Sequence, residues 1–335
     1  MRWTLKPKPD PKKTVNLATE LGVDMAIAEL LIQRGIESFE AAKTFFRPSW
    51  SDLHDPFLMK DMDKAVARIE DAITNAEQIL VFGDYDVDGT SSVALMASYL
   101  ETKSTTISTY IPDRYEEGYG ISYKGIDFAS DNNFTLIIAL DCGVKAVEKV
   151  AYAKKKGIDF IICDHHRPGK KLPAAIAVLD PKRSDCTYPF KELCGCGVGF
   201  KLIQALASRD GAPVESLSGY LDLVATAIGA DIVPIIGENR ALAYYGLQLI
   251  NSNPRPGFKA LITHMKKQVL TITDVVFNIA PRINAAGRMK HGNYAVALMK
   301  ETNFQNAEAA AAEIELFNTN RREADKRITQ EALLQ

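Results

Sequence analysis

The segment 78–103 reads QILVFGDYDVDGTSSVALMASYLETK and decides the class of fold. Its first six residues are apolar enough for a buried strand, and the stretch from Thr90 has the composition of a helix that opens with a Thr/Ser cap. Between them stand Asp84, Asp86 and Asp88, on alternate positions and followed by Gly89. A strand that passes through a short acidic turn into a helix is typical of the first half of a βαβ unit.

The same three aspartates and glycine also match the opening of an EF-hand calcium loop. That loop needs a helix in front of it and a bidentate glutamate at its twelfth position. Here a strand precedes the loop, and the twelfth position counted from Asp84 is Leu95. Both flanks therefore argue against a calcium loop.

Alternating strands and helices continue beyond this segment. Apolar runs predict further strands at residues 105–111, 135–141, 159–164 and 176–180, with a helix at 144–157 between two of them. From about Gly197 every apolar pattern is helical. We therefore expect an α/β fold with a mostly parallel twisted sheet flanked by helices, followed by an all-helical portion and a long C-terminal helix. The predicted divisions are a helical segment 1–75, a catalytic domain 76–300 with a sheet part 76–195 and a helical part 196–300, and a connecting helix 301–335.

Composition narrows the function classes only a little. The chain has 335 residues, of which 47% are hydrophobic and 24% charged, and its net charge is −2. Overall charge therefore does not indicate nucleic-acid binding, although a local basic groove is compatible with it. No signal peptide or membrane-spanning run is evident, and five cysteines without C-x-x-C spacing fit buried thiols in a reducing compartment. We expect a cytoplasmic protein that does not contact a membrane.

Three of the predicted strands end in acidic residues. In an open parallel sheet the carboxyl ends of neighbouring strands form one rim, where sites are usually built. The residues expected there are Asp84, Asp86, Asp88, Asp141, Asp164, His165 and His166. So many carboxylates in one place repel one another unless cations are bound. Oxygen ligands with one or two imidazoles favour Mn²⁺ over Ca²⁺, with Mg²⁺ as the alternative and Zn²⁺ less suited. This pattern predicts a two-metal phosphoesterase.

The helical half offers a further carboxylate and two segments with basic residues. Asp231 follows an apolar turn, and Asp222 lies nine residues before it and competes for the same role. The segment PRINAAGRM (281–289) supplies Arg282, Asn284 and Arg288, which suit phosphate and sugar contacts if it is a short loop. The segment PDRYEEGYG (112–120) contains Arg114, Tyr115 and Tyr119 between glycines, either as a plain surface turn or as an element that reads phosphates and stacks on bases.

Taken in order, the motifs DYDVDG, ALD, DHH and GAD resemble the four motifs of the DHH phosphoesterase superfamily. The segments PDRYEEGYG, PRINAAGRM and RPSWSDLHDPFLMKDMDKAVARI are similar to those of its RecJ family, bacterial single-strand-specific 5′→3′ DNA exonucleases. The resemblance implies a dinuclear site and catalytic roles for its acids and histidines. Its implied metal ligands are Asp84, Asp86, Asp88, Asp141, His165 and Asp231. It further implies that Asp141 bridges the ions, that His166 faces the scissile phosphate, and that Asp164 orients the imidazoles from behind. Arg114 and Arg288 match positions that contact nucleic-acid phosphates.

Two departures from the family pattern bear on this interpretation. Related pyrophosphatases and oligonucleotide hydrolases carry a metal-binding histidine at the position of Phe82, for which Asp84 is expected to compensate. RecJ-like chains also continue past a connecting helix into a DHHA1 domain and an oligonucleotide-binding barrel, so we expect this sequence to be a fragment that lacks them.

The resemblance implies an exonuclease for single-stranded DNA that uses two Mn²⁺ ions, or Mg²⁺, in DNA repair and recombination. It implies a monomer, and a single-strand-binding protein and a helicase as protein partners. Two other functions stay open. One is a pyrophosphatase or a phosphodiesterase for short oligonucleotides or cyclic dinucleotides, and the other is a catalytically weak protein that binds single-stranded DNA.

Overall fold

The computed structural model describes residues 4–104, 106–263, 265 and 267–334, and the chain divides into two compact units, Met1–Leu53 and His54–Gln335. Parts of the predicted strand at 105–111, of the predicted helical part 196–300 and of the predicted connecting helix 301–335 lie outside the described residues, at Thr105, His264, Lys266 and Gln335. The first unit contains α1 (Pro11–Leu21), α2 (Met25–Ile32), α3 (Phe39–Phe46) and the 3₁₀ turn η1 (Trp50–Asp52). Its small core is formed by Leu17, Ala18, Ala28, Leu31, Ile36 and Ala42.

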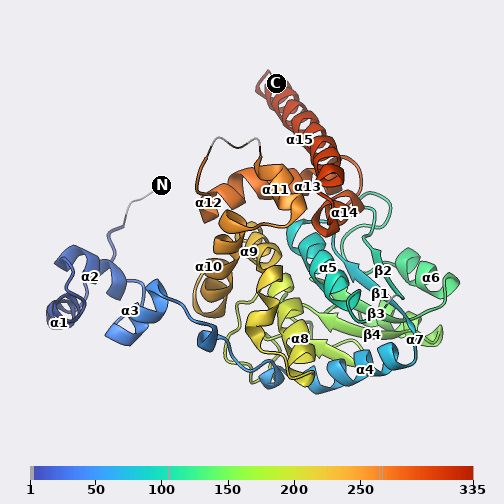
Figure 1. Ribbon diagram of the computed structural model, residues 1–335, viewed down its shortest axis with the longest axis horizontal. Helices are drawn as coiled ribbons and strands as arrows, with labels where there is room; N and C mark the ends of the chain where they lie inside the picture. Colours follow the sequence, from blue (N-terminus) through green and yellow to red (C-terminus); the bar gives the residue numbers. More distant parts are fainter. Residues whose placement is uncertain (1–3, 105, 264, 266, 335) are drawn as a thin grey trace. The chain divides into compact units, whose positions relative to one another are not determined.

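The second unit is built on a parallel sheet, as the sequence predicts (Figure 1). In the described residues the sheet has five strands in the order β2-β1-β3-β4-β5, and every pair is parallel. Their bounds are β1 Gln78–Gly83, β2 Ile107–Tyr110, β3 Phe134–Leu140, β4 Asp159–Cys163 and β5 Ala177–Leu179. The three strands with acidic ends, β1, β3 and β4, are therefore adjacent at the centre of the sheet. Their apolar residues are almost continuously buried, because helices cover both faces.

Two layers of helices enclose this sheet. Helices α6 (Tyr123–Asp131) and α7 (Val147–Lys155) pack on one face, over a core that includes Phe82 and Phe160. The other face is covered by α4 (Met62–Thr74), α5 (Val87–Leu100) and α8 (Gly195–Arg209), with the short turn η2 (Pro56–Leu58) beside α4 and α8. Helix α5 begins at Val87 rather than at the expected Thr/Ser cap, since the Asp86 side chain accepts a hydrogen bond from Gly89 N–H and caps the helix earlier. Helix α6 was not predicted.

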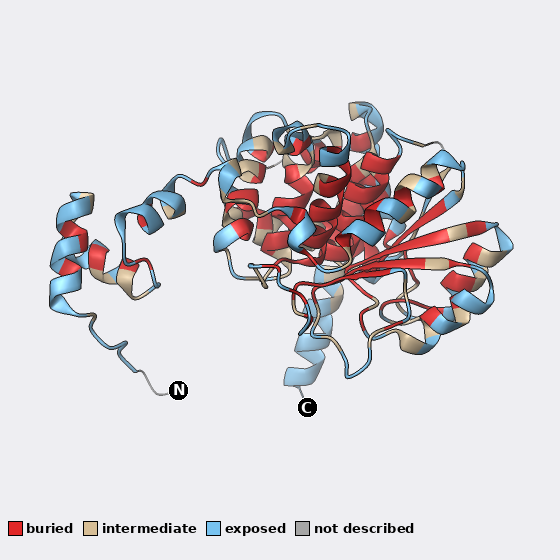
Figure 2. Cartoon of the chain, turned by 90° about the horizontal axis from the view of Figure 1, so that it is seen from below, coloured by how far each residue is buried: buried red, intermediate tan, exposed pale blue. Residues whose placement is uncertain are grey.

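The rest of the described chain is helical, as expected. It contains η3 (Val214–Tyr220), α9 (Leu221–Ala230), α10 (Gly237–Ser252), α11 (Pro256–Ile262), α12 (Ile272–Asp274), the π-helical turn η4 (Val275–Ile279), α13 (Ala280–Met289), α14 (Asn293–Lys300) and α15 (Phe304–Leu333). Helix α9 lies between α5 and α10, which ties the helical portion to the sheet. The first half of α15 packs on α11, α13 and α14, and its far end is exposed (Figure 2). Among the described residues, no helix combines the length and apolarity that a membrane span requires.

Candidate metal centre

The acidic residues at the ends of β1, β3 and β4 meet the C-terminus of α9. Around the His165 imidazole, Nε2 lies 3.2 Å from Asp141 Oδ1, 3.6 Å from Asp231 Oδ2 and 3.8 Å from Asp88 Oδ2. Asp88, Asp141 and His165 are buried. Four segments separated by up to 143 positions, from Asp88 to Asp231, therefore deliver nitrogen and oxygen donors to one point.

Two groups of donors are close enough to hold ions. Asp141, His165 and His166 form one group, and Asp88, His165 and Asp231 form the other, with the donor atoms of each group within 4.8 Å of one another. Asp84 and Asp86 continue the cluster on the β1 side, where the Asp84 carboxylate accepts a 3.2 Å hydrogen bond from Gly120 N–H. Of the predicted metal ligands, Asp88, Asp141, His165 and Asp231 are thus brought together, whereas Asp84 and Asp86 belong to neither group.

Helix α8 positions the Asp88 carboxylate. Its two oxygens accept hydrogen bonds from Gly195 N–H (2.7 Å) and Cys196 N–H (2.8 Å) at the first turn of the helix, where free backbone donors and the helix dipole favour a negative charge. A Cβ on Gly195 would lie 2.5 Å from Asp141 Cβ, so only glycine permits this approach. Like the other cysteines, Cys194 and Cys196 indicate in sequence only buried thiols. The alternate glycines of GCGVG before a helical run were the signal that could have indicated a carboxylate-binding helix start.

The backbone of Asp141 is unusual. Its φ is +58°, in the left-handed region that non-glycine residues rarely adopt, while its N–H donates to Cys163 O at 2.8 Å. Strain of this kind is typical of functional sites, where the surrounding structure holds a side chain in a required direction. Here it turns the carboxylate at the end of β3 toward His165.

Asp164 organises the two histidines from behind. Its Oδ1 accepts hydrogen bonds from the backbone N–H of His165 (2.8 Å) and of His166 (3.1 Å), and it lies 2.7 Å from His166 Nδ1. Its other oxygen accepts from Val144 N–H at 2.8 Å. Burial alone would raise the pKa of Asp164, but the hydrogen bond and the charge of His166 lower it. The pKa of His166 rises, chiefly because of the same hydrogen bond. The carboxylate therefore holds His166 with Nε2 directed away from it, 3.2 Å from Tyr119 Oη.

Burial and mutual repulsion oppose ionisation of the clustered acids. Burial, followed by the charge of Asp86, raises the pKa of Asp84 to about 7. Burial and then Asp231 raise the pKa of Asp88 to about 8, and burial with Asp86 raises that of Asp231 to about 6. The pKa of Asp141 rises well above its usual value for the same reasons, and burial lowers the pKa of His165 to about 4. The cluster therefore disfavours both several free carboxylates and a protonated His165.

These residues fit divalent cations. The side-chain atoms Asp84 Oδ2, Asp141 Oδ1, Asp231 Oδ2 and both ring nitrogens of His165 are buried without a hydrogen-bond partner among the described residues. Buried polar atoms in proteins are nearly always paired, so a group of unpaired acceptors in one place indicates a missing positive partner. A set of carboxylate oxygens and imidazole nitrogens is suited to Mn²⁺ or Mg²⁺. Structural zinc sites, by contrast, are usually rich in cysteine sulfur.

Phe82 and Asp222 lie outside the cluster. Phe82, at the position of the family's metal-binding histidine, belongs to β1, and its ring is buried in the core and stacks on Tyr110. Asp222, the competitor of Asp231, is fully buried and paired with the guanidinium of Arg255 at 2.8 Å. Of the two candidate carboxylates in the helical half, Asp231 is thus the one that reaches His165.

The segment 281–289 is a helix, α13, and the expectation of a short loop was wrong. Because a helix sends its side chains in different directions, Arg282 turns away and pairs with Glu315, whereas Asn284 and Arg288 line a cavity of about 550 Å³ together with Asp86 and Asp231. Arg321 of α15, which the sequence analysis did not single out, lines it too.

The segment 112–120 is irregular, as expected, and it contacts α13 through a hydrogen bond. Tyr115 Oη donates a 3.0 Å hydrogen bond to the carbonyl oxygen of Arg288. Arg114 lies over the ring of Tyr85, with its Cζ 5.0 Å from the ring centroid. Both arginine-bearing segments therefore lie beside the acidic turn that follows β1.

A parallel sheet with a rim of acids and paired histidines defines the class of protein. The family model described as "DHH family, N-terminal domain" matches residues 78–228. The single-stranded-DNA-specific exonuclease RecJ of Bacillus subtilis is 40% identical over 336 residues, 99% of this chain and 42% of the relative.

Solved structures agree with the sequence comparison. RecJ from Thermus thermophilus in complex with Mn²⁺ superposes with a TM-score of 0.86 at 27% identity, over 100% of this chain and 48% of that one. A manganese-bound exonuclease RecJ superposes with a TM-score of 0.75 at 31% identity, over 82% of this chain and 69% of that one. The chain belongs to the RecJ family. It spans about half the length of the curated relatives it matches.

Proposed function

We propose that the protein hydrolyses single-stranded DNA from its 5′ end and releases 5′-mononucleotides, with two Mn²⁺ or Mg²⁺ ions as cofactors. The observation that carries this proposal is the group of buried, unpartnered carboxylate and imidazole atoms at the ends of β1, β3 and β4. The names of the similar proteins, exonucleases specific for single-stranded DNA and structures containing manganese or magnesium, support it.

One of the two donor groups, Asp88, His165 and Asp231, would hold one ion. For the other ion we follow the family resemblance, by which Asp84 and Asp86 would contribute ligands and Asp141, 3.2 Å from His165 Nε2, would contribute to both ions. Bound there, the ions would supply charge neutralisation at the phosphate and an activated water. Asp164 keeps the histidine pair oriented throughout.

His166 is placed to act on the substrate itself. The hydrogen bond with Asp164 raises the pKa of His166, which shifts the side chain toward the protonated form whose Nε2–H can act as a donor. That nitrogen lies against Tyr119 Oη, whose side chain is half exposed and can give way to a phosphoryl oxygen. Asn284, Arg114 and Arg288 would contact the flanking phosphates and sugars. The bond between the scissile phosphorus and the 3′-oxygen breaks, and the new 5′-phosphate stays on the shortened strand.

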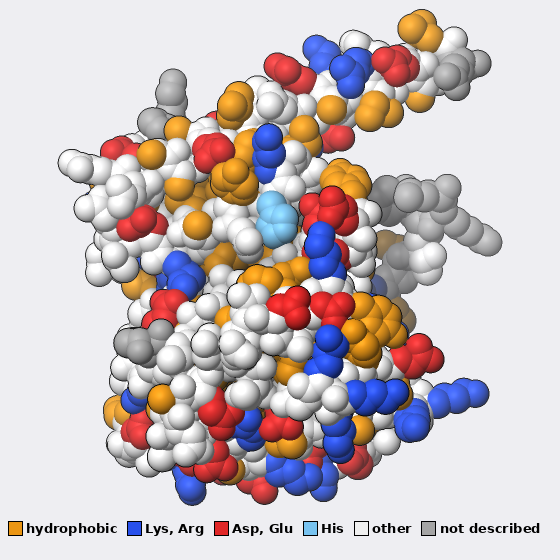
Figure 3. Space-filling view, turned by 90° about the vertical axis from the view of Figure 1, so that its right-hand side faces the viewer, with side chains coloured by type: hydrophobic (Ala, Val, Ile, Leu, Met, Phe, Trp, Pro, Cys, Tyr) orange, Lys and Arg blue, Asp and Glu red, His pale blue; other side chains and the backbone are white. Residues whose placement is uncertain are grey.

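The face of the molecule shown in Figure 3 carries no broad basic patch. Basic and acidic side chains are interspersed over the face shown in Figure 3, in line with the net charge of −2. We therefore propose that recognition is local, through the two arginine-bearing segments and stacking on aromatic side chains. A single-strand-binding protein and a helicase as partners, a cytoplasmic location and a monomeric state are further proposals that stand on the family resemblance alone.

The test is the release of mononucleotides from 5′-labelled single strands with Mn²⁺ and with EDTA. We expect Asp141→Ala and His165→Ala to reduce wild-type activity to the level of the EDTA reaction. Asp131→Ala, which removes an exposed carboxylate of α6, is the matched control and is expected to behave as wild type. Equal activity of all four proteins would refute the proposal. Higher turnover of dinucleotides or pyrophosphate than of long strands would favour the small-substrate alternative, and Mn²⁺ binding without hydrolysis would favour the binding protein.

A further inference from the structure

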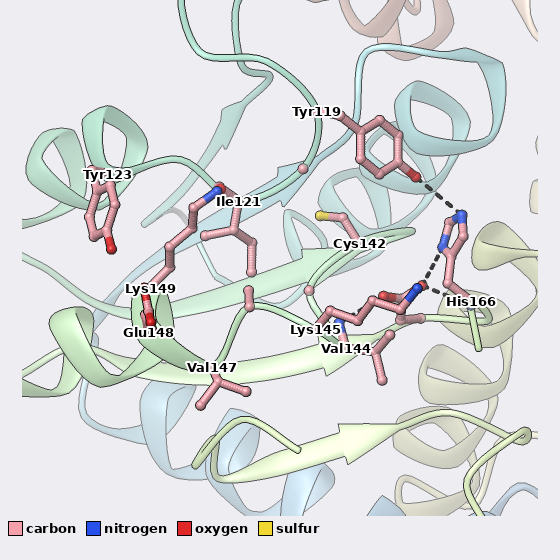
Figure 4. Close-up of a pocket in the computed structure, with 14 residues that line it drawn as sticks. Tyr119, Ile121, Tyr123, Cys142, Val144, Lys145, Val147, Glu148, Lys149 and His166 are labelled. Carbon is pink, nitrogen blue, oxygen red and sulfur yellow. Dashed lines mark hydrogen bonds and ion pairs between the residues drawn. The ribbon is translucent and has the colours of Figure 1, made fainter. Parts of the chain in front are cut away.

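A second cavity adjoins the metal centre on the side of His166, and the proposed reaction does not yet use it. Its volume is about 640 Å³, within the usual range for small-molecule sites. Tyr119 and His166 stand at one end, and Tyr123 and Lys149 at the other (Figure 4). The middle is lined by the apolar side chains of Ile121, Cys142, Val144 and Val147, with Lys145 beside them.

This cavity is tied to the histidine pair by hydrogen bonds. The loop after β3 is fixed by Val144 N–H, which donates to the same Asp164 carboxylate that holds His166. The opposite wall is joined to α7 because Lys149 Nζ donates to the carbonyl oxygen of Ile121. The walls are therefore held in register with His166, as a site that must align a ligand with the scissile phosphate requires.

The lining indicates the chemistry of the ligand. Two tyrosine rings and four small apolar side chains offer flat and non-polar surface, which suits a base and a sugar. Lys145 is exposed and has no charged partner among the described residues, so it is free to meet one phosphodiester. Glu148 and Asp164 also reach the cavity, and this mixed charge disfavours a site for a free phosphate dianion.

The cavity beside α13 indicates on which side of the metal centre the 5′ end of the DNA strand lies. It contains Arg288, Arg321 and Asn284. It also borders Asp86, Asp88 and Asp231, but in the proposed function these carboxylates would be neutralised by the metal ions, unlike Glu148 in the cavity beside His166. Two guanidinium groups suit the doubly charged 5′-terminal phosphate better than one lysine does. A scissile phosphate at the metal centre has one nucleoside on each side, so the terminal nucleoside belongs with the arginines. Accepting the function proposed above, we propose that the cavity lined by Tyr119, Lys145 and Val147 binds the second nucleoside of the strand, whose 5′-phosphate is attacked and which stays on the DNA.

The test uses the whole chain and compares three variants with wild type. Lys145→Glu reverses the free charge, and Val147→Trp fills the cavity. Lys154→Glu is the matched control, since Lys154 is an exposed lysine near the C-terminal end of α7, the helix that begins at Val147, and does not line the cavity. The probe is a 5′-phosphorylated oligothymidylate with a 3′ fluorophore, bound in Ca²⁺ and followed by anisotropy, and hydrolysis is measured separately in Mn²⁺. Melting temperatures identify any variant that is misfolded.

We expect Kd for the strand to rise about tenfold in Lys145→Glu and in Val147→Trp, the size of the loss of one stacked base, with Lys154→Glu equal to wild type. Wild-type Kd in both cavity variants would overturn the inference. Failure of the proposed function looks different. If the wild-type protein binds the strand but does not hydrolyse it in Mn²⁺, the proposed exonuclease function is refuted. The proposal for the cavity is then still tested by the Kd values of the variants. A wild type that does not bind the strand overturns both.

Discussion

Two of the regions in which the described residues bury charge stabilise it in opposite ways. Between α8 and α10, Lys201 is fully buried, and its Nζ donates to Glu238 Oε1 at 3.0 Å and to His54 O at 2.6 Å. Tyr188 Oη donates to the second oxygen of Glu238 at 2.6 Å, so the carboxylate is paired on both sides. At the metal centre, by contrast, several buried carboxylate oxygens and both ring nitrogens of His165 have no such partner among the described residues.

The difference separates structure from function. A buried ion pair with all its hydrogen bonds made keeps two helices in register, whereas a buried cluster of acceptors costs stability until a ligand supplies the positive charge. Local conflicts of this second kind concentrate at functional sites in natural proteins. The two regions should therefore respond oppositely when one charge is removed.

Lys201→Met should give the greatest loss of stability. It leaves Glu238 buried without its cation, which costs about 3–5 kcal/mol of unfolding free energy. Urea unfolding measures this loss. The double variant Lys201→Met/Glu238→Leu should recover a large part of it, because no unpaired charge remains. Equal stability of the single variant and wild type would show that the pair does not hold the helices together.

Asp164→Asn should weaken Mn²⁺ binding and activity by about 10- to 100-fold, the usual effect of losing a residue that orients metal ligands. The reason is that an amide is a weaker acceptor for the His166 imidazole and for three backbone N–H groups. Titration calorimetry with Mn²⁺ gives the affinity. A full loss of folding would be excluded by circular dichroism, and unchanged affinity would contradict the orienting role.

Asp141→Asn should act in the opposite direction from Lys201→Met when no metal is present. It removes one of the mutually repelling carboxylates, so the metal-free protein should gain about 1 kcal/mol at pH 8 while losing the stabilisation that Mn²⁺ confers. Thermal unfolding with EDTA and with Mn²⁺ measures both effects. A metal-free variant that is less stable than wild type would mean that Asp141 makes a necessary contact in the empty cluster.

The pH dependence of stability should reveal the same repulsion. The raised pKa values of Asp84 (about 7), Asp88 (about 8) and Asp231 (about 6) mean that the folded state binds more protons than the unfolded state from about pH 4 upward. Stability of the metal-free protein should therefore fall as pH rises through this window, up to about pH 8. With Mn²⁺ the fall should be smaller, and binding at about pH 6.5 should release protons, which calorimetry in two buffers detects. Absence of proton release would contradict the raised values.

The acidic rim was predictable from sequence because parallel strands place their carboxyl ends on one edge. The positions of Asp84, Asp86, Asp88, Asp141 and His165 follow from three apolar runs that each stop at an acid or at paired histidines. The sheet and the helical portion were predictable for the same reason, since continuous apolar runs mark buried strands.

The features that could not be predicted depend on contacts between residues that are far apart in the sequence. The choice between Asp222 and Asp231 rests on where Arg255 lies, 33 positions from Asp222, and no local pattern shows that pairing. The helical state of 281–289 was missed because Pro281 and Gly287 indicate a loop. Proline is nevertheless tolerated in a first turn, and the glycine leaves room for Tyr85, whose carbonyl oxygen a Cβ at that position would overlap. Gly195 at the start of α8 is needed because Asp141, at the end of β3, packs against it, and no local pattern shows that contact.

The most direct test of the central idea is an anomalous-scattering map of crystals soaked in Mn²⁺. The account predicts two peaks separated by about 3.5–4 Å, one bonded to Asp88, His165 and Asp231 and the other near Asp84 and Asp86, with Asp141 between them. A map without peaks in this cluster, or with lysine or arginine side chains occupying it, would contradict the account.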